Sequence, residues 1–384
     1  MDKRVYLLSI ITFIVGLVEL VIGGLLPLIA KDLNVSYGQV GLLISMFSLS
    51  FAISGPILLS LTSKMERKRL FLIVLFIFFL SNMIIVLSDM YVFLMAARIL
   101  SAMCASLLVS LCITIASQIS DDAYTARAIG LVLMGVSASL VFGVPFSLWL
   151  GSELGWRAPF LFIAILTLLL MLIVFLALGK IEPKKNLPLK AQVNAIKDRK
   201  ILLIHSISIV FFTGHMTLYA YLTPFLQATL HLSEKSLSLM YLIIGLFSIF
   251  GSLLGGFCTD RISAKRTIMV VLSLFSITII TIPFLKFSGI LFVGAILLWS
   301  LLSWSLQPAI QSYIVSSAST TSDIHQSLNN SGAHIGMALG STIGGTIIDS
   351  YSVEFNAIIG GTIACIALIV AIVTFKLQRN GSHS

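Results

Sequence analysis

Long apolar stretches separated by short charged loops run through the whole chain. At a rise of 1.5 Å per helical residue, about 20 residues cross the roughly 30 Å hydrocarbon core of a bilayer. Runs of this length are typical of membrane-spanning helices, and the weaker alternating pattern of a membrane barrel is not seen. The pattern therefore predicts an all-α membrane protein with twelve transmembrane helices. We expect them at residues 5–30, 38–61, 70–88, 91–117, 126–150, 157–179, 201–227, 236–258, 267–285, 289–315, 325–348 and 354–376.

The longest polar segment, residues 180–200, lies between the sixth and seventh predicted spans. It carries two prolines and many Lys and Arg residues, so we interpret it as a solvated cytoplasmic linker beside the anionic leaflet. It divides the chain into two six-span halves, residues 1–179 and 201–376, and a tail follows at 377–384. Each half has a basic loop after its second span, at residues 58–73 and 255–270. This repetition predicts two structurally related halves.

The composition supports a membrane protein and excludes an ordinary soluble domain. Apolar residues make up 58% of the chain, charged residues only 10%, and the mean hydropathy is +1.08, whereas soluble domains carry roughly 25% charged residues. The net charge of +9 lies in loops and does not indicate a nucleic-acid partner. Most Lys and Arg residues occupy alternate loops, which predicts that both termini are cytoplasmic. The first stretch is too long for the core of a signal peptide, so we expect it to be retained.

Glu19 is the only acidic residue that we place inside a membrane-length apolar stretch. A carboxylate there costs roughly 2.5–3.5 kcal/mol even on the lenient insertion scale, so it needs a partner, a proton or a water-filled cavity. The sequence therefore predicts that Glu19 carries protons. The alternative is a protonated Glu19 that only forms a hydrogen bond to a neighbouring helix.

Arg98 is the only basic residue that we place well inside a span. Its guanidinium stays charged, so it needs carbonyl oxygens or a carboxylate as partners. A nearby positive charge can release the proton of an acid, and this predicts a role in proton coupling together with Glu19. The alternative is that Arg98 only joins helices through backbone carbonyls.

Polar and aromatic side chains recur inside the spans of the second half. His215 and Tyr219 lie four residues apart on one helical face, and Trp304, Gln307 and Gln311 follow a similar spacing on the tenth span. Amide side chains can pair with the donor–acceptor edge of a flat heterocycle while aromatic rings stack on its face. We expect these residues, with Asn329 of the eleventh span, to bind substrate between the two halves. For each residue alone, packing between helices is an alternative.

The second-half basic loop, residues 256–266, resembles the conserved loop of the major facilitator superfamily. It contains the four residues that the resemblance identifies as a gating loop: Asp260, Arg261, Lys265 and Arg266. In the first-half copy, Ser63 stands at the usual Asp position and Glu66 at the usual Gly position.

The fifth span narrows the resemblance to the drug:proton antiporter branch of that superfamily. Residues 135–145, with Gly135, Gly143 and Pro145, resemble the antiporter motif of the branch, although one residue separates its last Gly from its Pro. Nearly the whole chain is also similar to the bacterial efflux pumps for purine bases and nucleosides. The segments that carry this likeness are residues 16–27, 65–70, 214–221, 302–309 and 322–327.

The resemblance implies a proton-coupled antiporter that exports purine bases, nucleosides or their analogues across the bacterial cell membrane. It also implies a monomer whose partners are protons, a small purine-like molecule and the lipid bilayer. A multidrug or sugar efflux pump of the same superfamily is the alternative, and a membrane sensor that binds a solute without moving it is a remote one. No phosphate-binding glycine loop, metal cluster, cofactor motif or nucleophile elbow occurs in the sequence, so we do not expect an enzyme.

Overall fold

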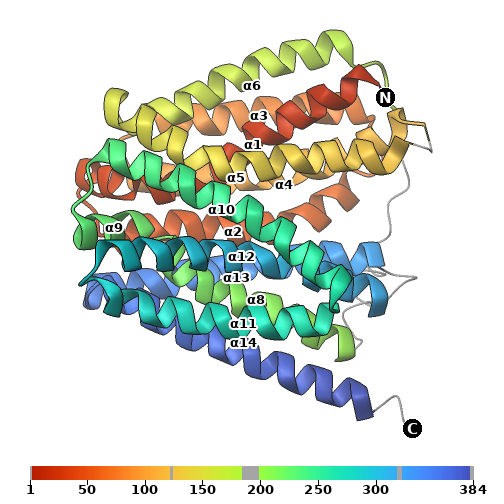
Figure 1. The fold of residues 1–384 in the computed structure, drawn as a ribbon. Helices are drawn as coiled ribbons and strands as arrows, with labels where there is room; N and C mark the ends of the chain where they lie inside the picture. The colour runs from red at the N-terminus through yellow and green to blue at the C-terminus, as the bar shows by residue number, and fades with distance from the viewer. Residues whose placement is uncertain (1, 122–123, 184–198, 318–321, 381–384) are drawn as a thin grey trace. The chain divides into compact units, whose positions relative to one another are not determined.

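The computed structural model describes residues 2–121, 124–183, 199–317 and 322–380, and within these ranges the secondary structure is helical (Figure 1). Most of the predicted linker, residues 184–198, lies outside the described part, as do residues 381–384 of the predicted tail. The described α-helices are α1 (Lys3–Leu33), α2 (Tyr37–Leu61), α3 (Arg67–Leu87), α4 (Tyr91–Ile119), α5 (Thr125–Leu154), α6 (Ala158–Ala177), α8 (Arg199–Tyr219), α9 (Leu222–Leu230), α10 (Glu234–Arg261), α11 (Ala264–Thr281), α12 (Gly289–Ser317), α13 (Ser322–Ser350) and α14 (Glu354–Asn380). A short 3₁₀ turn, η2 (Ile282–Leu285), follows α11.

The predicted all-α membrane fold is confirmed. Among the described residues, eleven helices are long and apolar enough to cross a membrane. The remaining predicted span, the eleventh at residues 325–348, corresponds to α13, which has 29 residues but is much more polar than the others. Its sequence is rich in Gly, Ser, Thr and Asn. α13 is therefore long enough to cross a membrane but less apolar than the eleven other helices.

The predicted seventh span is divided in the structure. α8 ends at Tyr219 and α9 begins at Leu222, although the apolar sequence continues across the junction. Pro224 lacks an N–H, and its ring would collide with the carbonyl of residue 220 in a continuous helix. The break is held by Tyr221, whose hydroxyl donates a hydrogen bond to the Ser341 carbonyl of α13 at 2.8 Å.

The ends of several helices are determined by local capping residues. Asp2 accepts a hydrogen bond from the Arg4 amide at the start of α1, and Ser233 caps α10 in the same way through Ser236. Asn34 ends α1 in a left-handed conformation, with φ of 54°, which asparagine tolerates better than most residues. These caps satisfy N–H and C=O groups that have no partner within the helix.

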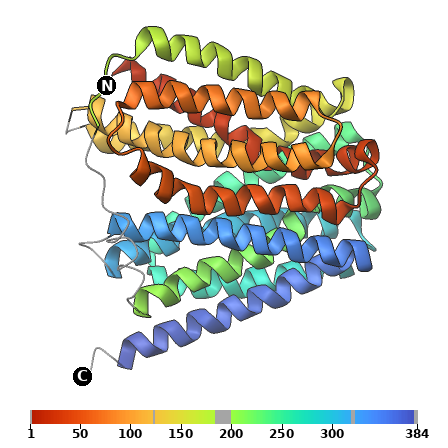
Figure 2. The same ribbon diagram turned by 180° about the vertical axis from the view of Figure 1, so that it is seen from behind.

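The chain forms two compact units. Unit 1 contains residues 1–35 and 46–189, and unit 2 contains residues 36–45 and 190–384. In unit 1, α1 packs against α5, and α3 packs between α4 and α6. In unit 2, α8 packs against both α13 and α14, while α12 packs against α10 and α11. Figure 2 shows α8 in green beside the two blue helices α13 and α14.

The beginning of α2 groups with unit 2 because of its contacts with α13. Asp349 accepts hydrogen bonds from the Gly38 amide at 2.9 Å and from the Ser36 hydroxyl at 2.6 Å. Ser341 donates to the Gly41 carbonyl at 3.0 Å. A side chain at Gly41 would collide with the Tyr221 hydroxyl, so the close approach requires glycine there.

Candidate functional site

Glu19 and Arg98 meet inside unit 1. Glu19 lies on α1 and is 9% exposed, and Arg98 lies on α4 and is 1% exposed. The Arg98 guanidinium donates hydrogen bonds to the carbonyl of Val18 at 2.8 Å and to the carbonyl of Glu19 at 3.4 Å. Its central carbon also lies 4.2 Å from the centre of the Phe47 ring, a favourable cation–π geometry. The structure therefore holds a buried cation against the helical turn that carries the buried acid.

The two glycines of the predicted antiporter motif lie where α5 packs against α1. A Cβ atom at Gly135 would collide with the Ser9 carbonyl and the Thr12 hydroxyl of α1. Thr12 in turn donates a hydrogen bond to the Val132 carbonyl of α5 at 2.8 Å. Gly143 is less crowded, because an added Cβ atom would only touch Leu17 at 3.4 Å. Close packing of this kind aligns the helix that carries Glu19.

Pro145, the third motif residue, lies inside α5, which is continuous through it. Its missing N–H removes one hydrogen bond from the helix without ending it in this context.

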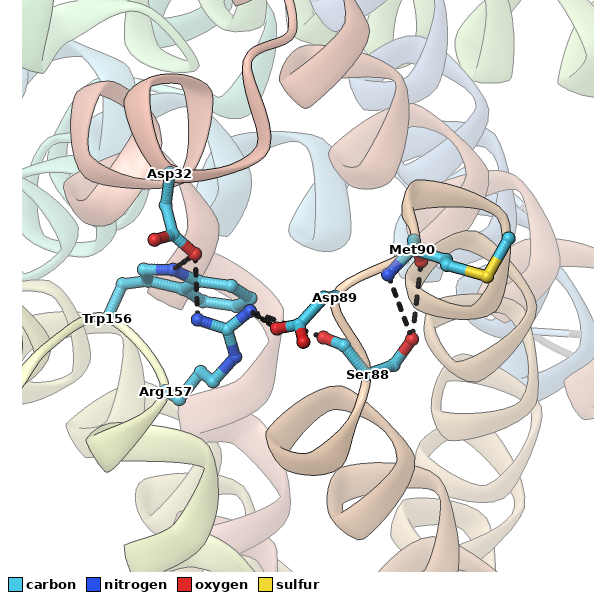
Figure 3. A network of polar contacts seen from close by, with 6 residues as sticks. All are labelled: Asp32, Ser88, Asp89, Met90, Trp156 and Arg157. Carbon is cyan, nitrogen blue, oxygen red and sulfur yellow. Dashed lines mark hydrogen bonds and ion pairs between the residues drawn. The ribbon is translucent and has the colours of Figure 1, made fainter.

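An ionic network ties three segments of unit 1 together at the end where α1 finishes (Figure 3). Arg157 contacts Asp32 at 2.7 Å and Asp89 at 2.7 Å, and it also donates to the Ser88 carbonyl at 3.3 Å. The Trp156 indole N–H donates to Asp32 at 2.9 Å, and Arg157 stacks over the Trp156 ring at 4.2 Å. The network joins the end of α1, the α3–α4 connection and the start of α6. Asp32 and Asp89 are not among the residues that the sequence predicts to be functional.

His215 and Tyr219 are in contact in unit 2, as their spacing predicts. Their ring centres are 5.2 Å apart and the planes are inclined by 26°. Trp299 of α12 contacts both rings, with its centre 5.1 Å from that of His215 and 6.1 Å from that of Tyr219. The Ser303 hydroxyl is 3.2 Å from His215 Nδ1. His215 and Trp299 are buried and Tyr219 is half-buried, so Tyr219 is the exposed edge of this aromatic cluster.

The sequence pattern predicts Trp304 as the tryptophan of the binding site, whereas the structure places Trp299 beside His215. A usable pattern was present, because Trp299 and Ser303 lie four residues apart and share a helical face. That face meets α8, and Trp304 lies on a different face of α12.

Gln307 and Gln311 line that different face of α12 together with Trp304. All three side chains are half-buried. The Oε1 atoms of both glutamines are shielded from solvent and have no hydrogen-bond partner among the described residues. Buried polar atoms are usually satisfied, so a ligand or a water molecule is the expected partner of these amides. Another face of α12 packs against α10, because Gly251 and Gly255 of α10 lie close to Leu301 and Ser305 of α12.

Asn329 lies in a different part of unit 2 from His215. It is fully buried, and its Oδ1 atom accepts a hydrogen bond from the Ser208 hydroxyl at 2.7 Å. His205 Nδ1 lies 3.5 Å from the same oxygen. His205 precedes His215 by ten residues, which is about 15 Å along α8. The structure therefore brings together part of the predicted binding set and separates Asn329 from it.

The predicted gating loop joins α10 to α11 and is largely exposed. Arg261 is the last residue of α10 and lies 5.2 Å from the Phe257 ring. Lys265 lies 5.7 Å from the ring of Tyr313 on α12 and 5.9 Å from that of Phe375 on α14. Asp260 and Arg266 are exposed. Lys265 is thus the loop residue that contacts two other helices of unit 2.

Comparisons with known proteins agree with this architecture. Residues 8–325 match the family model of the Major Facilitator Superfamily. The MFS-type transporter YbcL of Bacillus subtilis (strain 168) is 33% identical over 375 residues, covering 98% of this chain and 96% of the relative. The inner membrane transport protein YdhP of Escherichia coli (strain K12) is 28% identical over 97% of this chain and 95% of its own length. A solved structure of a bacterial homologue of the human lysosomal transporter Spinster, in an inward-facing and occupied conformation, shares the fold with a TM-score of 0.79. It has 15% sequence identity and covers 97% of this chain and 96% of that one.

Proposed function

Because the chain belongs to the Major Facilitator Superfamily and is a multi-pass membrane transporter, we propose that it is a proton-coupled antiporter that exports purine bases, nucleosides or their analogues. The observation that carries the coupling is the burial of Glu19 beside Arg98. An ionisable residue inside a span marks an ion pathway by default, and here a fixed cation lies at the same turn of α1. A positive charge beside a carboxyl group favours its ionised form, so movement of Arg98 can control when Glu19 binds a proton.

The polar groups of unit 2 support a heterocyclic substrate. Gln307 and Gln311 offer amide oxygens that lack partners among the described residues, and Trp304 lies on the same face of α12. Tyr219 provides a half-buried aromatic ring next to the buried His215. A purine has an aromatic face and a donor–acceptor edge, and both features match these groups.

We also propose that both termini face the cytoplasm of a bacterial cell. The basic loops that precede α3 and α11 then lie on the inner side, where Lys and Arg residues accumulate. With this orientation, protons that enter through the antiporter move down their gradient while substrate leaves the cell.

The test is transport by the purified protein in proteoliposomes with an imposed pH gradient. Radiolabelled adenine is expected to accumulate only when the gradient is present, and hypoxanthine and nucleosides should compete for its transport. Inhibition by sugars or lipophilic cations, with no effect of purines, would assign the protein to the multidrug or sugar exporters instead. Purine binding without gradient-driven flux would indicate a sensor.

A further inference from the structure

α8 and α13 run side by side in the same direction and are separated by a stripe of glycines. An added Cβ atom at Gly336, Gly340 or Gly344 would collide with backbone carbonyls of α8. The stripe has a spacing of four residues, so it faces α8 along most of its length. At the end where both helices begin, His325 and Asn329 of α13 occupy the seam in place of small residues.

A buried polar cluster fills that end of the seam. The rings of His205 on α8 and His325 on α13 have centres 5.7 Å apart and planes inclined by 31°. The two histidines are 5% and 2% exposed, and Asn329 is fully buried. Ser208 donates to Asn329 Oδ1, and His205 Nδ1 lies 3.5 Å from that oxygen. Two titratable rings are thus held next to each other inside a tight contact between helices.

The position of Asn329 determines the tautomer of His205. An amide oxygen accepts hydrogen bonds and cannot donate them, so the ring nitrogen that faces it carries the hydrogen. His205 Nδ1 is therefore the N–H nitrogen, and Nε2 holds the lone pair. Nε2 is shielded from solvent and has no hydrogen-bond partner among the described residues. A proton that binds His205 attaches at Nε2.

The groups that face the pair from neighbouring helices add little charge within the described part of the chain. α14 presents Ala367, Ala371 and Thr374 as its buried residues at this end, and Lys376 is exposed. α12 contributes Tyr313, which lies against Lys265 and Phe375. His215 and His334 lie about nine to ten residues further along their helices. The side chains of Arg199, Lys200, Asp323 and Arg379 lie outside the described part.

We propose that His205 and His325 form a second proton-binding site, separate from Glu19, that takes up its first proton at a higher pH than its second. The first proton binds at Nε2 of His205, and its charge then opposes protonation of the adjacent His325 ring. A charge buried in this tight seam costs free energy, so protonation separates the beginnings of α8 and α13. The pair acts as a pH-sensitive latch at this end of unit 2.

The existence of this proton site does not depend on the proposed function. Its role in transport rests on the proposed function. In the proposed orientation this end of the seam is cytoplasmic, so the pair would respond to internal pH. The latch would then favour opening of the inner side as the cytoplasm becomes acidic.

Histidine titration by NMR tests the site directly. The full-length protein, with ¹⁵N-labelled histidine, is placed in lipid nanodiscs and titrated between about pH 5 and 8. The chain has six histidines, which single His→Gln variants assign. We expect His205 and His325 to titrate in two steps separated by about one pH unit or more. In His205→Gln, His325 should titrate in a single step, and the reverse should hold for His325→Gln.

Two controls make the titration decisive. His231 is exposed and lies at the end of α9, so His231→Gln should leave the titration of the pair unchanged. Asn329→Leu removes the acceptor that faces Nδ1, so the ¹⁵N shifts of His205 should show a mixture of tautomers. Independent titration of the two rings, or no titration of either ring above about pH 5, overturns the proposal.

Hydrogen exchange tests the latch. Amides at residues 202–208 should exchange several-fold faster at about pH 5.5 than at about pH 7.5 after correction for intrinsic rates, and the His205→Gln and His205→Asn variants should abolish this difference. An equal difference in wild type and variants overturns the latch. Neither measurement uses transport, so failure of the proposed antiport would leave both results interpretable.

Discussion

At the scale of single residues, the buried charge of Arg98 is held by specific partners. Arg98 cannot lose its proton in a protein, and the carbonyls of Val18 and Glu19 together with the Phe47 ring receive its guanidinium. The sequence had left two roles open for Arg98, as a link between helices or as the partner of Glu19. The geometry is compatible with both, because the carbonyls that it binds belong to the turn of Glu19.

Glu19→Gln should fold and insert normally and lose proton-driven accumulation of substrate. Glutamine keeps the shape of the side chain and removes the titratable group, so the cost of burial falls while coupling is lost. The measurement is purine accumulation in proteoliposomes with and without a pH gradient. Wild-type accumulation by this variant would exclude Glu19 as the proton carrier.

Arg98→Lys should behave as a severe substitution although it keeps the positive charge. Arginine reaches two carbonyls with a rigid planar group, whereas lysine offers a point charge that can deprotonate when desolvated. We expect slower transport and a shifted pH optimum in the same assay. Normal rates with an unchanged optimum would leave Arg98 with a structural role alone.

Trp304→Ala and Gln307→Ala should weaken purine binding by roughly ten- to a hundredfold. Stacking of a base on an aromatic ring is worth about 1–3 kcal/mol in other proteins, which corresponds to that range. Trp304→Ala should affect all substrates, and Gln307→Ala should affect some purines more than others because it contacts the polar edge. Trp149→Ala, at a site that is 54% exposed on α5, is the control. An equal loss in the control, or none in the pair, would contradict this assignment.

At the scale of helices, polar side chains at helix ends hold neighbouring segments in place. Glu66 stands where the superfamily loop usually has glycine, and it caps α3 by accepting from the amides of Lys68 at 2.9 Å and Arg69 at 2.7 Å. It also accepts from the Ile181 amide at 2.9 Å, while the Arg67 amide donates to the Ile181 carbonyl at 3.0 Å. The start of the linker is thereby fixed to the α2–α3 loop within unit 1.

Glu66→Gln should destabilise the protein by about 0.5–2 kcal/mol, because one amide oxygen cannot replace two carboxylate oxygens that accept from three N–H groups. Burial alone would raise the pKa of Glu66, but the three backbone donors outweigh it and lower the pKa below 4.5. The stabilisation is thus fully present above the unfolded-state value and is lost as pH falls through the lowered one. Thermal unfolding should show a difference from wild type at neutral pH that shrinks below about pH 4.5.

Glu182→Gln is the matched control for this measurement, since Glu182 is exposed next to Ile181. It should change the unfolding temperature little at any pH. An equal effect of both substitutions would show that general charge, and not the cap, is responsible.

At the scale of the whole molecule, the apolar pattern was sufficient to predict the all-α membrane fold. It predicted the location of α13 in spite of the polar composition of that helix, but it did not predict the break before Leu222. That break depends on Pro224 and on the tertiary hydrogen bond from Tyr221 to Ser341. A hydropathy pattern contains no information about such a bond.

In the candidate site, only contacts between residues of the same helix could be predicted from the sequence, because they follow from helical spacing. The contact between His215 and Tyr219 follows from their separation of four residues. The position of Trp299 beside His215, and that of Asn329 beside Ser208, depend on which faces of separate helices meet. Those contacts are tertiary, so no local pattern in one helix specifies them.

The orientation of the whole molecule gives the last prediction. Lys64 lies in the exposed loop between α2 and α3, and Phe287, which is 78% exposed, lies between η2 and α12. The alternation of basic loops places Lys64 inside the cell and Phe287 outside it. A membrane-impermeant thiol reagent applied to intact cells should therefore label Phe287→Cys at once, and Lys64→Cys only after the membrane is permeabilised. The unsubstituted protein is the control, because Cys104 and Cys112 are buried and Cys258 and Cys365 are partly buried. The opposite labelling pattern would show that the protein has the reverse orientation in the membrane. Inward proton flow could then no longer drive export through it.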